Sequence, residues 1–277
     1  MPRFRFSFIP LLALLLSAGG AAAQAHGEHG DHLEPAAWTR HPQLLVTMTR
    51  GAAPGLRVSA VGGAFEHVVL QTPEAPAAVV LDAAAGGWTV SKAQMGSGGH
   101  LWLMATRENA SEVVRAATHY FFPARHRVPT EMLRAPRGGL EIVPLRLQEH
   151  GGTREGSRWR FLLRHDNQAL PGKPLTLETE GGSRRQFEAD ADGIAEVVFP
   201  HDFRPERLTA KEGINARQAF VLAVEHEAGG KRHLTTYNHV YNPDRMRERS
   251  LALGAGVFAL GMLLAVPLLR RKEKKDA

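Results

Sequence analysis

The sequence has 277 residues, with 34 Lys and Arg, 28 Asp and Glu, 14 His and no Cys, and its net charge is +6. The absence of Cys excludes a disulfide scaffold, a thiolate metal site and a cysteine nucleophile. Residues 1–25 hold two basic residues and no acids, and residues 270–277 hold five basic and two acidic residues, which leaves 27 basic and 26 acidic residues in 26–269. A body this close to neutral argues against nucleic-acid binding, although the isoelectric point is about 10.

Residues 1–25 have the three parts of a secretory signal peptide. Two arginines precede an apolar run over Ile9–Leu16, and Ala23-Gln24-Ala25 supplies an A-x-A cleavage site. The apolar run is too short to span a bilayer comfortably, which favours cleavage over an uncleaved anchor. We therefore expect a mature chain that begins at His26.

The mature N-terminus, assigned to residues 26–35, is rich in side chains that bind metals. Three imidazoles and two carboxylates lie within its first seven residues, and they form the candidate metal site: His26, Glu28, His29, Asp31 and His32. Short His-rich tracts bind nickel, cobalt, copper or zinc, so a divalent transition metal is the expected cofactor. Mature position three is Glu28 rather than His, which departs from the N-terminal copper and nickel motif. A solvated, His-rich linker is the alternative interpretation.

Residues 36–136 are predicted to form a first β-rich domain. Short apolar stretches separated by Gly and Pro are typical of strands and turns. The candidate strands are Leu44–Thr49, Leu56–Val61, His67–Gln71, Ala78–Leu81, Leu101–Ala105 and Ala116–Phe122. A short helix is a weaker candidate over 108–115. His100 and His119 are expected to be structural, and the Gly- and Pro-rich segment 134–139 marks a joint between domains.

Residues 137–243 are predicted to form a second domain, an antiparallel β-sandwich. The segment 158–164 alternates between apolar and basic residues, which is the period of a half-buried strand. Hairpins are expected around 190–193 and 227–230, where turn residues separate two strand-like runs. The predicted fold class is therefore all-β, with two antiparallel β-sandwich domains of the immunoglobulin or transthyretin type and one C-terminal transmembrane helix.

Three further patterns in the second domain have weaker functional interpretations. Arg158, Arg160 and Arg164 share one strand face, which indicates a solvated surface or, less favourably, an anion site. His226 and His233 are expected to be cross-strand neighbours in a hairpin, an incomplete metal-ligand set on an otherwise polar sheet face. Asp190-Ala191-Asp192-Gly193 begins like a calcium loop but lacks the remaining ligands, so a plain β-turn is expected.

The sequence does not indicate an enzyme. It contains no G-x-S-x-G elbow, Gly-rich phosphate loop or H-E-x-x-H motif, and no spacing groups Ser, His and Asp into a catalytic set. A copper redox centre on the N-terminal histidine would need a second ordered His, which the pattern does not supply.

The pattern of the C-terminal residues predicts a membrane anchor. A charged juxtamembrane linker is assigned to 244–249, a transmembrane helix to 250–269 and a basic cytoplasmic tail to 270–277. Leu251 to Leu269 carry no charge and would span about 28 Å as a helix, close to the thickness of the hydrocarbon core. Basic residues stay on the cytoplasmic side, so the body is expected in the periplasm and the C-terminus in the cytoplasm.

Several segments of the second half resemble one bacterial periplasmic family, described as associated with nickel or cobalt uptake. The segments that carry the resemblance are Leu140–Pro144, Gln148–Gly151, Trp159–Leu163, Ala169–Gly172, Thr176–Thr179, Asp192-Gly193, Phe199–Phe203 and Pro267–Arg271. The resemblance implies a sandwich domain related to carboxypeptidase-regulatory or transthyretin-like modules. It also implies a mature chain that begins with histidine, which His26 fits, although Gly27-Glu28-His29 replaces the aromatic and acidic run that usually follows.

The expected function is a membrane-anchored periplasmic protein that handles a divalent metal, is accessory to nickel or cobalt uptake and is not an enzyme. The expected partners are an inner-membrane metal transporter or an outer-membrane receptor, together with the inner membrane itself, and no nucleic acid. The alternative is an envelope protein–protein interaction module with no metal role.

Overall fold

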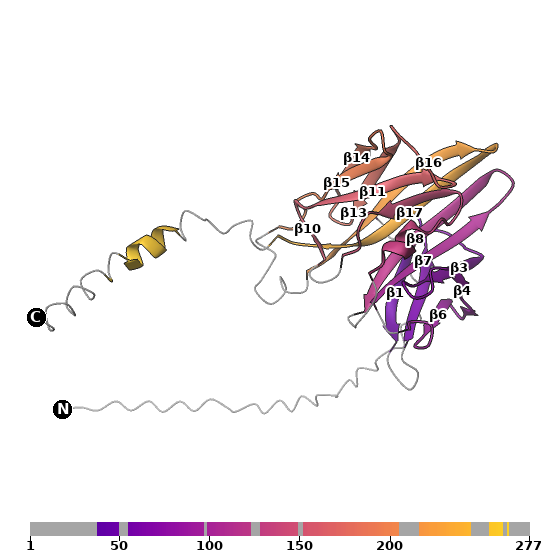
Figure 1. Cartoon of the computed structure of the whole chain (residues 1–277), viewed down its shortest axis with the longest axis horizontal. Helices are drawn as coiled ribbons and strands as arrows, with labels where there is room; N and C mark the ends of the chain where they lie inside the picture. Colours follow the sequence, from indigo (N-terminus) through magenta and orange to yellow (C-terminus); the bar gives the residue numbers. More distant parts are fainter. Residues whose placement is uncertain are drawn as a thin grey trace, which may run out of the picture. The chain divides into compact units, whose positions relative to one another are not determined.

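A computed structural model describes residues 38–49, 55–96, 99–122, 128–148, 152–204, 216–244, 255–262 and 265. The chain divides into two units, Met1–His32 and Leu33–Ala277, and every described residue belongs to the second. Strands dominate this unit, as the all-β prediction requires (Figure 1).

The strands of the described residues form three sheets. The N-terminal sheet has, in order, β1 (Gln43–Thr49), β2 (Gly55–Val61), β6 (Gly87–Ser91) and β5 (Ala83–Ala84). The central sheet has β14 (Arg184–Glu188), β13 (Pro174–Thr179), β16 (Gln218–Ala228), β17 (Lys231–Asn242), β8 (Glu112–Phe122), β7 (Gly99–Glu108), β3 (His67–Gln71) and β4 (Val79–Val80), and β10 (Thr153–Arg154) pairs with β17. The covering sheet has β12 (Gln168–Ala169), β11 (Arg158–His165) and β15 (Ile194–Val198), with β9 (Leu140–Pro144) also paired to β11.

The central sheet crosses the predicted boundary between residues 136 and 137. β8 pairs in parallel with β17 through the register Arg232↔Glu112 to Asn238↔Thr118, and β10 pairs in parallel with the end of β17. This corrects the expectation of two separate, purely antiparallel sandwiches, because the two halves of the chain share one sheet. A parallel pairing between distant segments leaves no mark in the local hydrophobic period, from which the boundary was predicted.

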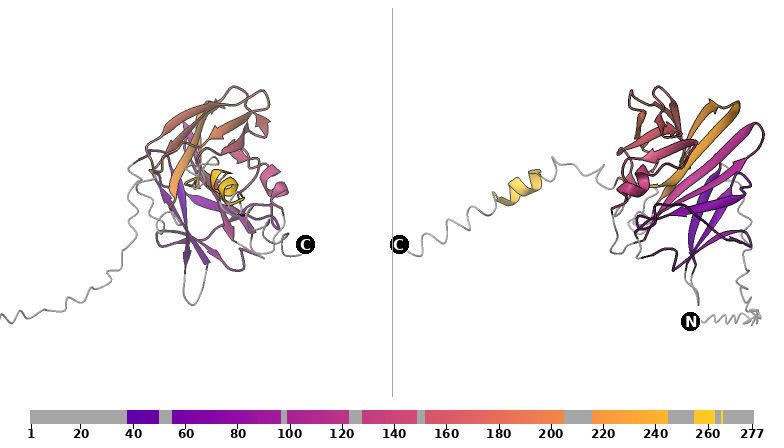
Figure 2. Two further views of the ribbon diagram at one scale, coloured as in Figure 1. Left: turned by 90° about the vertical axis from the view of Figure 1, so that its left-hand side faces the viewer. Right: turned by 45° about the vertical axis from the view of Figure 1, so that its right-hand side comes forward.

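The two faces of the central sheet bury two different cores. On β7, Leu101, Leu103 and Ala105 belong to the core that contains residues of the N-terminal sheet, whereas Trp102 and Met104 belong to the core that contains residues of the covering sheet. Successive residues of a strand point to opposite faces. The N-terminal and covering sheets therefore pack against opposite faces of the central sheet (Figure 2).

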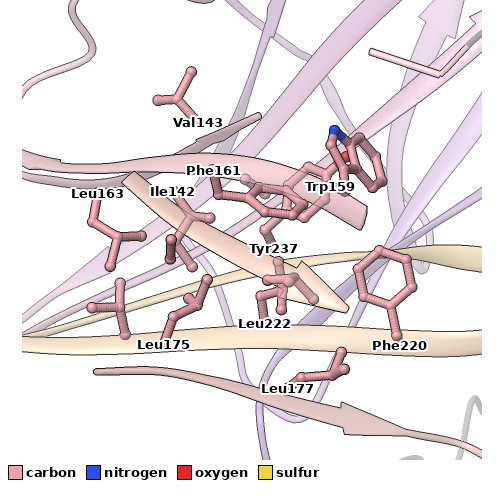
Figure 3. Close-up of a cluster of buried hydrophobic side chains, with 14 of the residues drawn as sticks. Ile142, Val143, Trp159, Phe161, Leu163, Leu175, Leu177, Phe220, Leu222 and Tyr237 are labelled. Carbon is pink, nitrogen blue, oxygen red and sulfur yellow. The ribbon is translucent and has the colours of Figure 1, made fainter. Parts of the chain in front are cut away.

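Aromatic rings fill the core beneath the covering sheet. Figure 3 shows Trp159 and Phe161 of β11 above Tyr237 of β17 and Phe220 of β16. Tyr237 is fully buried and stacks on Trp102 with ring centroids 5.6 Å apart. The apolar alternation predicted along 158–164 is thus confirmed, since Trp159, Phe161 and Leu163 all belong to this core.

Two predicted local features take a different form. Residues 112–115 of the candidate helix lie in β8, and the Asn109 side chain instead accepts hydrogen bonds from the Ser111 and Glu112 amides in a tight turn. A short helix, α1, instead covers Thr130–Arg134.

The segment around 190–193 does not form the expected hairpin. It connects β14, which pairs with β13 in the central sheet, to β15, which pairs with β11 in the covering sheet. The other hairpin, β16–β17, is confirmed.

Residues 255–262 of the proposed anchor are helical. Among the described residues, no helix has the length and apolar character needed to cross a membrane. The rest of 250–269, apart from residue 265, lies outside the described residues.

Side chains of the central sheet hold the free edge of β1. Asn238 of β17 is 6% exposed, and its amide accepts a hydrogen bond from the Leu44 N–H at 2.9 Å and donates one to the Leu44 carbonyl at 2.8 Å. Thr236 donates to the carbonyl of Pro42 at 2.6 Å. At Leu44, the backbone of this edge strand is therefore satisfied by a side chain rather than by another strand.

Replacing Asn238 with Ala is expected to lower the free energy of unfolding by about 2 kcal/mol, because it leaves a buried backbone N–H and carbonyl without partners. Urea unfolding followed by tryptophan fluorescence measures the change. The control is Gln186→Ala on the exposed strand β14, which is expected to stay within about 0.5 kcal/mol of wild type. Equal stability of the two variants would contradict the role assigned to Asn238.

Candidate functional site

The five residues of the predicted N-terminal metal site lie outside the described residues. They are His26, Glu28, His29, Asp31 and His32. Their assignment as metal ligands stays a prediction from the sequence.

Three other histidines come together between the central and covering sheets. We call His165, His226 and His233 the outer histidine cluster. The ring centroid of His165 is 5.0 Å from that of His226 and 4.8 Å from that of His233. His226 and His233 are directly paired in the register of β16 and β17. The expected cross-strand pair is therefore confirmed, and the covering sheet adds a third ring.

The alternation of each strand explains why these rings meet. His165 follows Phe161 and Leu163 at the same spacing along β11, and His226 follows Leu222 and Val224 along β16. These four apolar side chains are buried in the same core. The outer histidine cluster thus occupies the positions at which the apolar rows of the sandwich would otherwise continue.

Polar groups lie beside two of the three rings. Nδ1 of His165 is 3.3 Å from the carboxylate of Asp166, which makes an ion pair only when the ring is protonated, and His233 has a hydrogen bond with the backbone of Ala228. Nε2 of His165, Nδ1 of His226 and Nδ1 of His233 are buried and have no hydrogen-bond partner among the described residues.

The surroundings favour uncharged imidazoles. Burial lowers the pKa of His226, and the nearby cation of Lys173 lowers it further. Burial also lowers the pKa of His233, to which His165 and Arg115 add. At neutral pH these two rings are therefore bases with free lone pairs rather than cations.

The outer histidine cluster is not a metal site in this structure. Within the described ranges of the chain, no three His, Asp or Glu side chains form a group that could hold a metal ion. Ring contacts join His165 to each of the other two histidines.

A second pair of histidines lies deeper in the same face of the central sheet. Nδ1 of His119 is 2.6 Å from the Tyr237 hydroxyl, and its Nε2 is 2.9 Å from Nε2 of His239. Burial lowers the pKa of His239 to about 4, with a contribution from Arg217, and holds the pKa of His119 well below its usual value. Hydrogen bonding and packing account for His119, in agreement with a structural role.

The arginine stripe does not form one solvated face. Arg158 is exposed and pairs with Glu196 at 2.7 Å, as expected for a surface ion pair. The Arg164 side chain is 5% exposed and binds the carboxylate of Glu141 at 2.9 Å. This corrects the interpretation of Arg164, because Glu141 of β9 and the backbone carbonyls of Arg134 and Ala135 enclose its guanidinium group.

The loop at 190–193 is a turn that uses its own carboxylate. Oδ1 of Asp190 accepts hydrogen bonds from the amides of Asp192 and Ile194 at 3.0 and 2.8 Å. The carboxylate that would begin a calcium loop is thus engaged by the backbone, as in an Asx turn.

Comparison with known proteins assigns no family. No family model matches the chain, and no curated protein matches it. Solved structures that match include a 1.5-MDa bacterial ice-binding adhesin studied for host cell surface retention, at 14% identity and a TM-score of 0.23 over 74% of this chain and 65% of that one. A Ca²⁺-stabilised adhesin of an Antarctic bacterium matches at 15% identity and a TM-score of 0.24, over 74% of this chain and 49% of that one.

A third match is the FN1–FN3 region of chicken CNTN1, at 9% identity and a TM-score of 0.21, covering 73% of this chain and 67% of that one. The chain spans less than two thirds of the length of both adhesin structures. At such identities and scores, these similarities carry no argument about function.

Proposed function

We propose that this is a membrane-anchored periplasmic protein that handles a divalent transition metal, assists nickel or cobalt uptake and catalyses no reaction. The observation that carries the proposal is the cluster of three imidazoles and two carboxylates in the seven residues that follow the expected cleavage site. Imidazole suits nickel, cobalt, copper and zinc, whereas hard cations such as magnesium prefer oxygen ligands.

The ends of the chain support a periplasmic location. A signal-peptide pattern precedes the His-rich tract, and an uncharged segment followed by five basic residues ends the chain. In the described part of that segment, residues 255–262, the large apolar side chains are exposed: Val257, Phe258, Leu260 and Met262. Lipid would cover such side chains, which is why we place the helix in the inner membrane.

The strands that follow the tract in the sequence form a folded unit, which we call the β-body. Its strands are joined into one unit by the central sheet, and its first described residues enter β1, which Asn238 fixes to that sheet. In this proposal the tract captures the ion, and the body docks on an inner-membrane metal transporter or an outer-membrane receptor.

The test uses the full-length protein in detergent with its native, processed N-terminus. Intact mass measurement establishes whether His26 is the first residue. Calorimetric titration with nickel, cobalt, copper and zinc is then expected to show binding tighter than micromolar that is lost or weakened at least tenfold in the triple variant His26→Ala, His29→Ala, His32→Ala.

The matched control replaces an exposed histidine of the body, His201→Ala, and is expected to bind like wild type. Unchanged titration curves in the triple variant, or no binding by the wild type, would remove the metal role of the tract. The interaction-module alternative would then be the better account of the protein.

A further inference from the structure

We infer that the end of the β-body at which β17 finishes binds the anionic phospholipid headgroups of the membrane that holds the C-terminal segment. The inference rests on the membrane location in the proposed function and goes beyond it, because it concerns a surface of the body and no metal ligand. We call this surface the basic end. It is defined by six exposed arginines: Arg146, Arg154, Arg158, Arg160, Arg204 and Arg217.

The strand pairings bring three of these arginines to the end of β17. Arg154 of β10 is paired with Asn242, the last residue of β17. Arg158 begins β11 opposite Val198, the last residue of β15. Arg217 immediately precedes β16, which runs antiparallel to β17. Figure 1 shows β10 and the turn of the β16–β17 hairpin at opposite ends of the body.

The other three arginines lie beside the same strand ends. Arg160 lies on the outer face of β11, since its neighbour Trp159 belongs to the core. The Trp159 indole donates a hydrogen bond to the Arg146 carbonyl at 2.8 Å, which places that residue next to the start of β11. Arg204 lies next to β10, because the amide that precedes it donates to the carboxylate of Glu155 at 2.8 Å.

Most of these arginines have no carboxylate partner. Arg158 pairs with Glu196 at 2.7 Å, whereas the other five side chains form no ion pair within the part of the chain that the structure describes. The remaining carboxylates near this end, Glu155, Asp202 and Asp244, are buried or half-buried. Asp202 is also occupied by three side-chain hydroxyls, which donate hydrogen bonds to it. The exposed surface at this end therefore carries an excess of positive charge.

The opposite end of the body is acidic. Its exposed carboxylates include Glu108, Asp166, Asp190, Asp192, Glu225 and Glu227. The two basic side chains of the hairpin there are paired, Lys231 with Glu108 at 2.6 Å and Arg232 with Glu112. A body that is close to neutral as a whole is thus electrically polarised along its strands.

The chain leaves the β-body at the basic end. β17 finishes at Asn242, and the uncharged C-terminal segment begins at Leu251. The chain between these two residues can extend over at most about 30 Å. If the segment lies in the bilayer, the basic end is consequently held close to the lipid surface, which raises its effective concentration there.

Lipid phosphates suit exposed arginines. A guanidinium group presents several N–H donors in a plane and binds a phosphate through two of them. An anionic membrane surface attracts basic groups that lie within a Debye length, about 8 Å at physiological salt. Because the arginines lie on a folded surface, their contact with lipid would orient the whole body, with its acidic end away from the membrane.

The experiment measures the orientation of the full-length protein in lipid vesicles. The chain has no Cys, so one donor dye can be attached at His201→Cys beside the basic end or at Glu227→Cys at the acidic end. The vesicles contain phosphatidylcholine, with or without phosphatidylglycerol, and an acceptor dye on their headgroups. Phosphatidylglycerol is expected to raise energy transfer from position 201 about twofold and to lower it from position 227. Both changes are expected to disappear at about 1 M salt, where the Debye length is about 3 Å.

Neutral substitutions in the basic end test the arginines directly. The triple variant Arg154→Gln, Arg160→Gln, Arg217→Gln is expected to show the same energy transfer in both kinds of vesicle. Its melting temperature is expected to stay close to that of wild type, because these side chains are exposed. The matched control removes three positive charges elsewhere, through Lys92→Gln, Arg134→Gln and Arg232→Gln, and is expected to behave like wild type.

Equal energy transfer in neutral and anionic vesicles would overturn this inference. So would an equal loss of the response in the matched control, since net charge rather than the basic end would then be responsible. Flotation with phosphatidylcholine vesicles tests the membrane location separately. A protein that does not float contradicts the anchored location and with it this inference, whereas one that floats without an arginine-dependent change contradicts this inference alone.

Discussion

Replacing Glu141 with Ala is expected to lower the free energy of unfolding by about 3–5 kcal/mol, the usual cost of removing one partner from a buried ion pair. For a folded unit of this size, that corresponds to a fall in melting temperature of about 10 °C or more. The effect is large because one carboxylate neutralises two buried guanidinium groups.

The geometry around Glu141 explains this expectation. The side chains of Glu141, Arg137 and Arg164 are 3%, 2% and 5% exposed. Glu141 accepts hydrogen bonds from Arg164 Nε and Nη2 at 3.1 and 2.9 Å and from Arg137 Nη1 at 3.1 Å. Burial lowers the pKa of Arg137, and the adjacent Glu141 opposes that change. Without Glu141, two cations would remain in a site that excludes water.

The remaining contacts of Arg164 and Arg137 connect the segment before β9 to the covering sheet and to the central sheet. Arg164 donates to the carbonyls of Arg134 and Ala135, and Arg137 donates to Gln71 of β3 and lies 4.7 Å from the centroid of the Trp102 ring. Loss of Glu141 is therefore expected to loosen the connection between the covering and central sheets as well as the ion pair.

Urea and thermal unfolding followed by circular dichroism provide the measurement. The control is Glu196→Gln, which removes an ion pair whose Arg158 partner is 70% exposed. An exposed pair contributes little, so this variant is expected to lose less than about 1 kcal/mol. A Glu141→Ala protein as stable as the control would show that the buried network has no net role.

Local alternation predicted the strands well, but it did not predict how they are assembled. Trp159, Phe161 and Leu163 are apolar at every second position, and all three lie in the core. The parallel pairing of β8 with β17 joins residues about 120 positions apart in the sequence. Nothing in either strand alone encodes that partner, which is why the two halves look like independent sandwiches.

Local alternation also explains which of the clustered histidines were predicted to be neighbours, and why Arg164 was predicted to be exposed. The pair His226 and His233 follows from a hairpin, whose register is local. His165 shares the apolar phase of β11, so extending that phase by one position would have placed it in the interior. Arg164 has the opposite phase and would face solvent, except that Glu141 and two backbone carbonyls from elsewhere in the chain enclose it.

Acid is expected to destabilise the fold through His239 and His119 before most carboxylates titrate. The pKa of His239 is about 4 in the folded protein, against 6.5 for an unperturbed imidazole, and the pKa of His119 is also lowered, mainly by burial. At pH 7 both rings are neutral in the folded and unfolded states. Below about pH 6.5, these histidines bind protons in the unfolded chain but stay neutral in the folded protein. The free energy of unfolding therefore decreases as the pH is lowered.

The size of the effect follows from the change in pKa. One pKa unit corresponds to about 1.4 kcal/mol, and His239 retains some contact with water, so its contribution is about 2–3 kcal/mol between pH 6.5 and 4. The loss levels off near pH 4, where the folded ring also binds a proton. His119 adds to this loss, because its Nε2 lies 2.9 Å from His239 and a second charge there would be repelled.

Urea unfolding at a series of pH values from 7 to 4.5 tests this expectation by comparing wild type with His239→Gln. The variant cannot take up the proton, and its amide can still bond Nε2 of His119, so its stability is expected to fall about 2 kcal/mol less than that of wild type. Carboxylates titrate equally in both proteins and cancel in the difference. His67→Gln on the exposed end of β3 is the control. Parallel pH curves for wild type and His239→Gln would mean that the ring at position 239 is already charged in the folded protein or is reached by water.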